Sequence, residues 1–249
     1  MAERIDANLE PVAQVRQLME ILRGPQGCAW DRAQGFADIA PYTIEEAYEV
    51  KDAIDRGDMD ELKAELGDLL FQTIFQSRIA EEAGLFDFDA VCQLLVDKMV
   101  RRHPHVFGDA ETLDWETAKA EERRGQRTLD GVALALPALM RAQKIQKRAS
   151  KVGFDWDDAT GPAAKVREET AEVLDARPEE RHEEVGDLLF AVVNLARHMG
   201  VDAESALRDA TAKFERRFEG VEDRLGERLG EATLAEMDAA WEAVKACEP

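Results

Sequence analysis

Apolar residues recur at intervals of three and four along almost the whole chain, which is the spacing of an amphipathic α-helix. The spacing is clearest in two stretches, at Leu62, Leu66, Leu69, Leu70 and Thr73 and at Val185, Leu188, Leu189, Val192 and Val193. Glycine and proline residues, which tend to end helices, leave segments of helix length between them. These breaks fall at residues 24–27, 57, 84, 104, 108, 125, 131, 137, 153, 161–162, 178 and 200. Strand-like alternation is scarce, so the sequence predicts an all-α fold.

One string of this helical pattern occurs twice, as ELGDLLF at residues 65–71 and as EVGDLLF at residues 184–190. A repeated identity of five residues is expected by chance in about one chain in fifty of this length and composition. The similarity extends, in the same order, to Trp-Asp, Glu-Glu-x-x-Glu and Lys-x-x-Arg-Arg motifs around the string. The repeat predicts two tandem helical-bundle domains from an internal duplication. We place them at residues 1–122 and 133–249, with a polar linker at residues 123–132.

Each copy of the repeat carries two pairs of acidic residues. Residues three apart on an α-helix project from one face, so Glu46 and Glu49 form one pair, and Glu65 and Asp68 form another on the next helix. The connection is short enough to favour an antiparallel hairpin, which brings the four carboxylates together. The second copy repeats the four as Glu169, Glu172, Glu184 and Asp187.

Four converging carboxylates repel one another and favour a bound cation. Hard oxygen ligands without histidine or thiolate suit Mg²⁺, with Mn²⁺ as a substitute. The alternative interpretation is a solvated acidic face, which is common in so acidic a chain. Duplication argues against it, because a solvated face has no packing reason to keep four acids in register.

Two other interpretations of the acidic residues compete with a Mg²⁺ site. A carboxylate-bridged di-iron bundle normally presents two Glu-x-x-His pairs, and this sequence has one, Glu179 with His182. A non-catalytic helical module, with structural or decayed metal sites and an interaction or regulatory role, is the alternative that fits the N-terminal copy best.

The composition and net charge of the chain exclude several classes of binding partner. The 249 residues carry a formal charge of −21, which repels nucleic acids and acidic membrane surfaces. The three cysteines lie far apart, as expected in a reducing cytoplasm, and neither a secretory signal nor a membrane segment is expected. A small phosphate ligand therefore needs metal ions or a local basic cluster, such as Lys213, Arg216 and Arg217.

Taken together, the motifs resemble the MazG nucleoside triphosphate pyrophosphohydrolases, in their two-domain bacterial form. The resemblance covers nearly the whole chain, through GCAWDRAQGFADIAPYTIEEAYEV, ELGDLLFQ, RRHPHVF, LPALMRAQKIQKRASKVGFDW and EEVGDLLFAVVNLARH. It implies an all-α homodimer that hydrolyses nucleoside triphosphates to monophosphate and diphosphate with Mg²⁺. The motifs do not indicate which base the protein prefers, so we expect either broad specificity for ordinary nucleotides or a housecleaning specificity, that is, hydrolysis of aberrant nucleotides.

Carried over by position, the resemblance implies that the C-terminal copy is the main catalytic one. Its metal ligands would be Glu169, Glu172, Glu184 and Asp187, and we expect Glu168 to orient or deprotonate the attacking water. The implied nucleotide contacts are Lys165, Glu168, Glu180, Arg181, His182, Glu183, Lys213, Arg216, Arg217 and Trp241. The N-terminal copy keeps its acids, as candidate ligands Glu46, Glu49, Glu65 and Asp68, but has no evident counterpart of Trp241.

Overall fold

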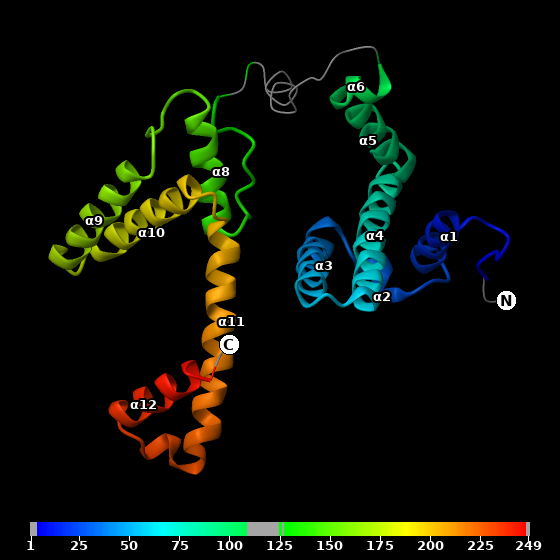
Figure 1. Cartoon of the computed structure of the whole chain (residues 1–249). Helices are drawn as coiled ribbons and strands as arrows, with labels where there is room; N and C mark the ends of the chain where they lie inside the picture. Colours follow the sequence, from blue (N-terminus) through cyan, green and yellow to red (C-terminus); the bar gives the residue numbers. More distant parts are fainter. Residues whose placement is uncertain (1–3, 109–124, 126, 248–249) are drawn as a thin grey trace. The chain divides into compact units, whose positions relative to one another are not determined.

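The computed structural model describes residues 4–108, 125 and 127–247, and within these ranges every regular element is a helix (Figure 1). The prediction of an all-α fold is confirmed. The chain divides into two compact units, Met1–Arg124 and Gly125–Pro249, each of which contains one copy of the repeat. The expected linker at residues 123–132 lies partly outside the described residues, and its limits stay a prediction.

The N-terminal unit is built on a hairpin of two long helices. Its helices are α1 (Pro11–Arg23), α2 (Ala29–Ala33), α3 (Phe36–Arg56), α4 (Met59–Glu82), α5 (Phe88–Arg102) and α6 (Pro104–Phe107). The chain reverses between α3 and α4 at Gly57, whose φ of 69° is the left-handed conformation that glycine adopts without strain. Asp58 then begins α4 by accepting a hydrogen bond from the Glu61 N–H at 3.0 Å.

A small apolar core holds this hairpin against α1. Met19 of α1, Ile39 of α3 and three residues of α4, Ile74, Phe75 and Ile79, are buried together. Burying a side chain such as Phe75 contributes about 1.5–3 kcal/mol. The register of α3 on α4, which decides where their acidic residues meet, follows from this packing.

The C-terminal unit repeats the hairpin and adds a long helix. Its elements are α8 (Ala138–Ser150), α9 (Thr160–Asp175), α10 (Arg181–His198), α11 (Ala203–Leu225), η1 (Gly226–Glu231) and α12 (Leu234–Lys245). Helices α9 and α10 lie side by side, α8 packs on α10, and α12 folds back on α11 (Figure 1). No helix in the described part of the chain has both the length and the apolar character to cross a bilayer.

One predicted helix break is wrong. Gly161 and Pro162 were expected to interrupt the helical pattern, but both lie in the first turn of α9, which begins at Thr160. Proline is tolerated there because the first backbone N–H groups of a helix have no partner within the helix. Pro162 is fully buried, so the residue contributes to packing instead of ending the helix.

Candidate active site

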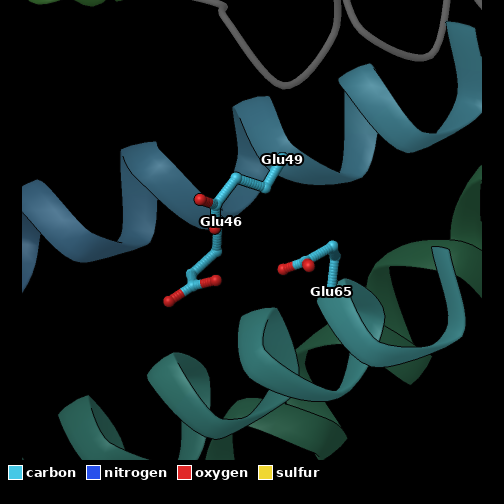
Figure 2. A group of neighbouring side chains, drawn as sticks. All are labelled: Glu46, Glu49 and Glu65. Atoms are coloured by element: carbon cyan, nitrogen blue, oxygen red, sulfur yellow. The ribbon is translucent and has the colours of Figure 1, made fainter. Parts of the chain in front are cut away.

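The structure brings three of the four predicted N-terminal ligands together. Glu46 and Glu49 extend from α3 and Glu65 extends from α4 into the space between the two helices (Figure 2). One carboxylate oxygen from each lies within 4.8 Å of the others. Asp68 does not join this group.

Burial and mutual repulsion act on the N-terminal acids. Burial raises the pKa of Glu46, the negative charges of Asp68 and Glu49 raise it further, and the hydrogen bond from Gln72 opposes them. The same causes, burial first and then Glu49 and Asp68, raise the pKa of Glu65. Asp68 therefore acts on the cluster through its charge, although its oxygen is not among the three grouped atoms.

The C-terminal copy forms two overlapping acidic groups. Glu169, Glu184 and Asp187 offer oxygens within 4.8 Å of one another, and so do Glu168, Glu169 and Glu172. Glu169 belongs to both groups, so it links all four predicted C-terminal ligands. The hairpin of α9 and α10 thus produces the convergence that the spacing of the acids predicts.

Lys165 is a cation of the chain itself that lies against two of these acids. Its Nζ donates to Glu168 Oε1 at 2.7 Å and lies 2.6 Å from Glu169 Oε1. These two hydrogen bonds, Glu168 first, raise the pKa of Lys165, so the side chain stays charged. The pKa of Glu172 is raised by burial and then by the charge of Glu169.

The donor set fits a hard divalent cation. Glu169 is 4% exposed, and its second oxygen, Oε2, is buried without a hydrogen-bond partner. A buried anionic oxygen that lacks a partner is costly, and clustered carboxylate oxygens are the ligands that Mg²⁺ and Mn²⁺ prefer. The unpartnered Oε2 marks the point where such an ion would relieve the repulsion.

The two copies differ in what holds their central glutamate. Glu46 accepts a hydrogen bond from Gln72 Nε2 at 3.2 Å, whereas Glu169 is paired with Lys165. At the matching places in the repeat, Tyr42 precedes Glu46 by four residues as Lys165 precedes Glu169. In the C-terminal copy a lysine one helical turn before the central glutamate therefore pairs with it, whereas a tyrosine stands at that place in the N-terminal copy.

A cavity of about 390 Å³ opens beside the C-terminal cluster. It is lined by Leu129, Ile145, Gln146, Ala149, Phe154, Asp155, Trp156, Pro162, Lys165, Glu169, Asp187, Phe190, Ala191, Asn194 and Arg197. Acidic and basic groups of the cluster stand in its wall, and most of the remaining lining is apolar. Such a cavity suits a small molecule with a charged end and a flat apolar end.

The far end of the cavity carries an ion pair. Arg197 donates to Asp155 through two nitrogens, at 2.8 and 2.5 Å, and His198 Nε2 lies 2.8 Å from the same carboxylate. Led by the bond from Arg197, these contacts lower the pKa of Asp155 to about 2. The pair is therefore ionised at neutral pH and its charges balance.

The predicted nucleotide contacts fall in different places. Lys165 and Glu168 belong to the acidic cluster, and Glu180 accepts a hydrogen bond from Arg177 Nε at 3.0 Å just before α10 begins. Arg181, His182 and Glu183 form the first turn of α10. Lys213, Arg216 and Arg217 lie on α11 and Trp241 on α12, and none of these four lines the cavity.

Trp241 takes part in a second, smaller core where α12 packs on α11. Its ring lies 5.2 Å from that of Phe214, and the Arg217 guanidinium lies 5.7 Å from its centroid. Trp241 also packs against buried Val221, Leu225 and Ala240. Within this unit the tryptophan therefore holds α11 to α12.

Sequence reasoning missed Gln146, Asp155 and Asn194 as cavity residues. Gln146 and Asp155 lie inside the family-like stretch LPALMRAQKIQKRASKVGFDW, but nothing in that stretch assigns them a role in a cavity. The sequence repeat did draw attention to Arg197, because Arg197 occupies the same place in the C-terminal copy as Arg78 does in the N-terminal copy. The shared arginine has different partners, however, because Arg78 bonds to Glu81 and Glu82 of its own helix.

Comparison with known proteins connects this geometry to a family. A model described as the MazG nucleotide pyrophosphohydrolase domain matches residues 34–107 and 161–221. A nucleoside triphosphate pyrophosphohydrolase of Escherichia coli K12 is 50% identical over 248 residues, covering 92% of this chain and 94% of that protein. A nucleoside triphosphate pyrophosphohydrolase/pyrophosphatase MazG of Thermotoga maritima is 45% identical, covering 92% and 93%. A nucleoside triphosphate pyrophosphohydrolase of Mycobacterium tuberculosis is 40% identical over 133 residues, covering 50% and 41%.

Proposed function

Because the chain belongs to the MazG nucleotide pyrophosphohydrolase family, we propose that it hydrolyses nucleoside triphosphates to monophosphate and diphosphate at the C-terminal acidic cluster. Glu169, Glu172, Glu184 and Asp187 would hold Mg²⁺ there, or Mn²⁺ in its place. The observation that carries this proposal is the unpartnered Oε2 of Glu169, a residue that lines a cavity of suitable size. Broad or housecleaning nucleotide specificity, a homodimeric assembly and a cytoplasmic location are parts of the same proposal.

The bound cation would offset triphosphate charge and lower the pKa of a coordinated water. The chain's own residues supply the remaining functions. Lys165 contacts both Glu168 and Glu169, so its ammonium group would become available to a phosphate oxygen if a cation took its place at Glu169. Glu168 would accept the proton of the attacking water. The resemblance to the family assigns Lys213, Arg216 and Arg217 to the charge on the departing diphosphate, and within this unit these three residues lie on α11, outside the cavity wall.

A second function is proposed for the N-terminal copy, as a non-catalytic metal-binding helical module with a regulatory role. Its central Glu46 is satisfied by Gln72 and has no lysine in the place of Lys165. A cation can still bind three clustered carboxylates, but the copy lacks the positive charge that we assign to the triphosphate.

Release of diphosphate from a panel of ordinary and modified nucleoside triphosphates tests both proposals. We expect metal-dependent release that chelator abolishes and that falls at least about 100-fold in Glu172→Gln, because a ligand that stabilises the transition state is lost. The matched variant Glu49→Gln, at the equivalent position of the other copy, should retain wild-type turnover. Substantial activity in Glu172→Gln, or equal loss in both variants, would contradict the assignment of catalysis to the C-terminal copy.

A further inference from the structure

We propose that Lys165 supplies the positive charge of a metal ion in the nucleotide-free C-terminal cluster, so that a divalent cation and a triphosphate bind there interdependently. The N-terminal cluster, by contrast, binds a divalent cation without nucleotide. This inference rests on the proposed function and deepens it, because it gives the two copies different conditions for taking up metal.

The helix itself holds Lys165 against the acids. Lys165 precedes Glu168 by three residues and Glu169 by four, and residues at these spacings share one face of an α-helix. Its Nζ lies 2.7 Å from Glu168 Oε1 and 2.6 Å from Glu169 Oε1. Because the Glu169 side chain is almost fully buried, water and salt screen this ion pair less than they screen an exposed one. The ammonium group therefore balances part of the acidic charge before any ligand binds.

A divalent cation bound at Glu169 would lie close to this ammonium group. Lys165 is bonded to Oε1, and Oε2 of the same carboxylate is the buried oxygen without a partner. Two cations on one carboxylate repel each other, and the repulsion is strong where burial keeps solvent out. A cation that binds alone must therefore push Lys165 away from Glu169, and this weakens the binding of the cation.

A triphosphate removes this penalty because it gives Lys165 another anion to bind. The lysine side chain is 38% exposed and lines the same cavity as Glu169, so its flexible stem can turn from the carboxylate toward a phosphate oxygen. The phosphate oxygens also complete the ligand shell of the cation. Each ligand thus favours the other, and thermodynamic linkage makes the effect on the two affinities equal.

The N-terminal cluster is arranged differently. Tyr42 stands one helical turn before Glu46, at the place that Lys165 holds in the other copy. Glu46 is bonded to the side-chain amide of Gln72, which carries no charge and does not repel a cation. Figure 2 shows Glu46 and Glu65 facing each other across the space between α3 and α4. A cation that enters this space has no ammonium group to displace from Glu46.

Arg56 is a basic residue near the N-terminal cluster, and its charge acts on Glu65. Its guanidinium has carboxylate partners of its own, however, because Nε donates to Asp52 and Nη2 donates to Glu61. Arg56 can therefore keep both bonds when a cation binds between α3 and α4. We accordingly expect the N-terminal cluster to bind a cation without a second ligand.

Equilibrium dialysis of the full chain against Mn²⁺ tests the difference between the copies. Without nucleotide, we expect one tightly bound ion per chain, which is lost in Glu49→Gln and kept in Glu172→Gln. At the same free Mn²⁺ concentration, a non-hydrolysable ATP analogue should raise the number of bound ions, and Glu172→Gln should remove this rise. In Lys165→Met the C-terminal site should bind Mn²⁺ without nucleotide, with an affinity at least about tenfold higher than in the wild type. The matched control Lys144→Met removes an exposed lysine of α8 and should leave one site.

Two nucleotide-free sites of similar affinity in the wild type overturn the inference without recourse to any variant, and so does the absence of bound Mn²⁺ before nucleotide is added. A Lys165→Met chain that binds Mn²⁺ as the wild type does overturns the role of the lysine. Diphosphate release, measured separately, keeps the proposed function apart from this inference. The expected binding pattern without turnover means that the proposed catalysis alone fails. Turnover with two equal nucleotide-free sites means that the inference alone fails.

Discussion

At the scale of single residues, the buried polar groups of the C-terminal unit are of two kinds: some have hydrogen-bond partners within the chain and others have none. Asp155 is satisfied within the chain, since Arg197 and His198 both contact its carboxylate. Glu169 Oε2 and Gln146 Oε1 are not satisfied. Satisfied groups stabilise the fold, whereas the unsatisfied ones raise its free energy until a ligand binds.

The Asp155 pair should make stability depend on acid pH. Because the folded pKa of Asp155 is lowered from 3.8 to about 2, its contribution is fully present above the ordinary value and is lost as pH falls through the folded value. We expect Asp155→Asn to lower the free energy of unfolding by about 1–2 kcal/mol at neutral pH. Urea unfolding of both proteins from pH 7 to pH 2 checks this, and a difference at pH 2 as large as that at pH 7 would contradict it.

Glycine inside the repeat string should be replaceable. A Cβ at Gly67 or Gly186 would meet no described atom within 4 Å, and glycine costs about 0.5–1 kcal/mol relative to alanine inside a helix. Gly186→Ala should therefore raise the free energy of unfolding by up to about 1 kcal/mol, measured by urea denaturation. A loss of stability instead would show that another chain packs on this face of α10.

At the scale of elements, the first turn of α9 positions one wall of the cavity. A Cβ at Gly161 would lie 2.2 Å from Cδ1 of Trp156, a distance that no side chain tolerates. The contact explains why glycine stands at this point in a helix. It also couples the indole, which lines the cavity, to the start of the helix that carries Glu169 and Glu172.

Gly161→Ala should accordingly displace the indole and weaken substrate binding. Overpacking costs about 1–3 kcal/mol, so we expect kcat/KM for nucleoside triphosphates to fall about tenfold or more. Gly230→Ala is the control, because its added methyl group meets nothing within 4 Å. Unchanged kinetics in Gly161→Ala, with a shift in tryptophan fluorescence that shows the ring has moved, would exclude Trp156 from the binding surface.

At the scale of the whole molecule, duplication produced two hairpins with the same acids and different surroundings. The chain reverses at Gly57 in one copy, whereas Pro178 lies between α9 and α10 in the other. Both hairpins place carboxylates from two helices together. The turn can therefore vary while the packing of the two helices preserves the cluster.

Separate cores in the two units predict separable effects of mutation. Gly57→Ala forces a left-handed conformation on alanine and should destabilise the N-terminal unit by about 1 kcal/mol. Release of diphosphate should stay at the wild-type rate below the unfolding transition, because the C-terminal cluster is unaffected. Parallel thermal unfolding and activity measurements check this, and a proportionate loss of both would show that catalysis depends on the N-terminal unit.

The sequence by itself determined the helices, the duplication, the family and most of the acidic cluster. These features depend on local periodicity and on residues three or four apart, which a helix places on one face whatever surrounds it. Even the break expected at Gly161 and Pro162 failed for a local reason, the tolerance of proline in a first turn.

Tertiary structure decided which polar groups are left without partners. Gln146 and Phe190 lie 44 residues apart, and Asp155 and Arg197 lie 42 apart, so no motif records that they meet. Asp68 has the expected spacing but stays outside the N-terminal group, because packing of α3 on α4 sets the rotation of each helix. Burial and long-range contact together determine whether an acceptor is satisfied by the chain or left for a ligand.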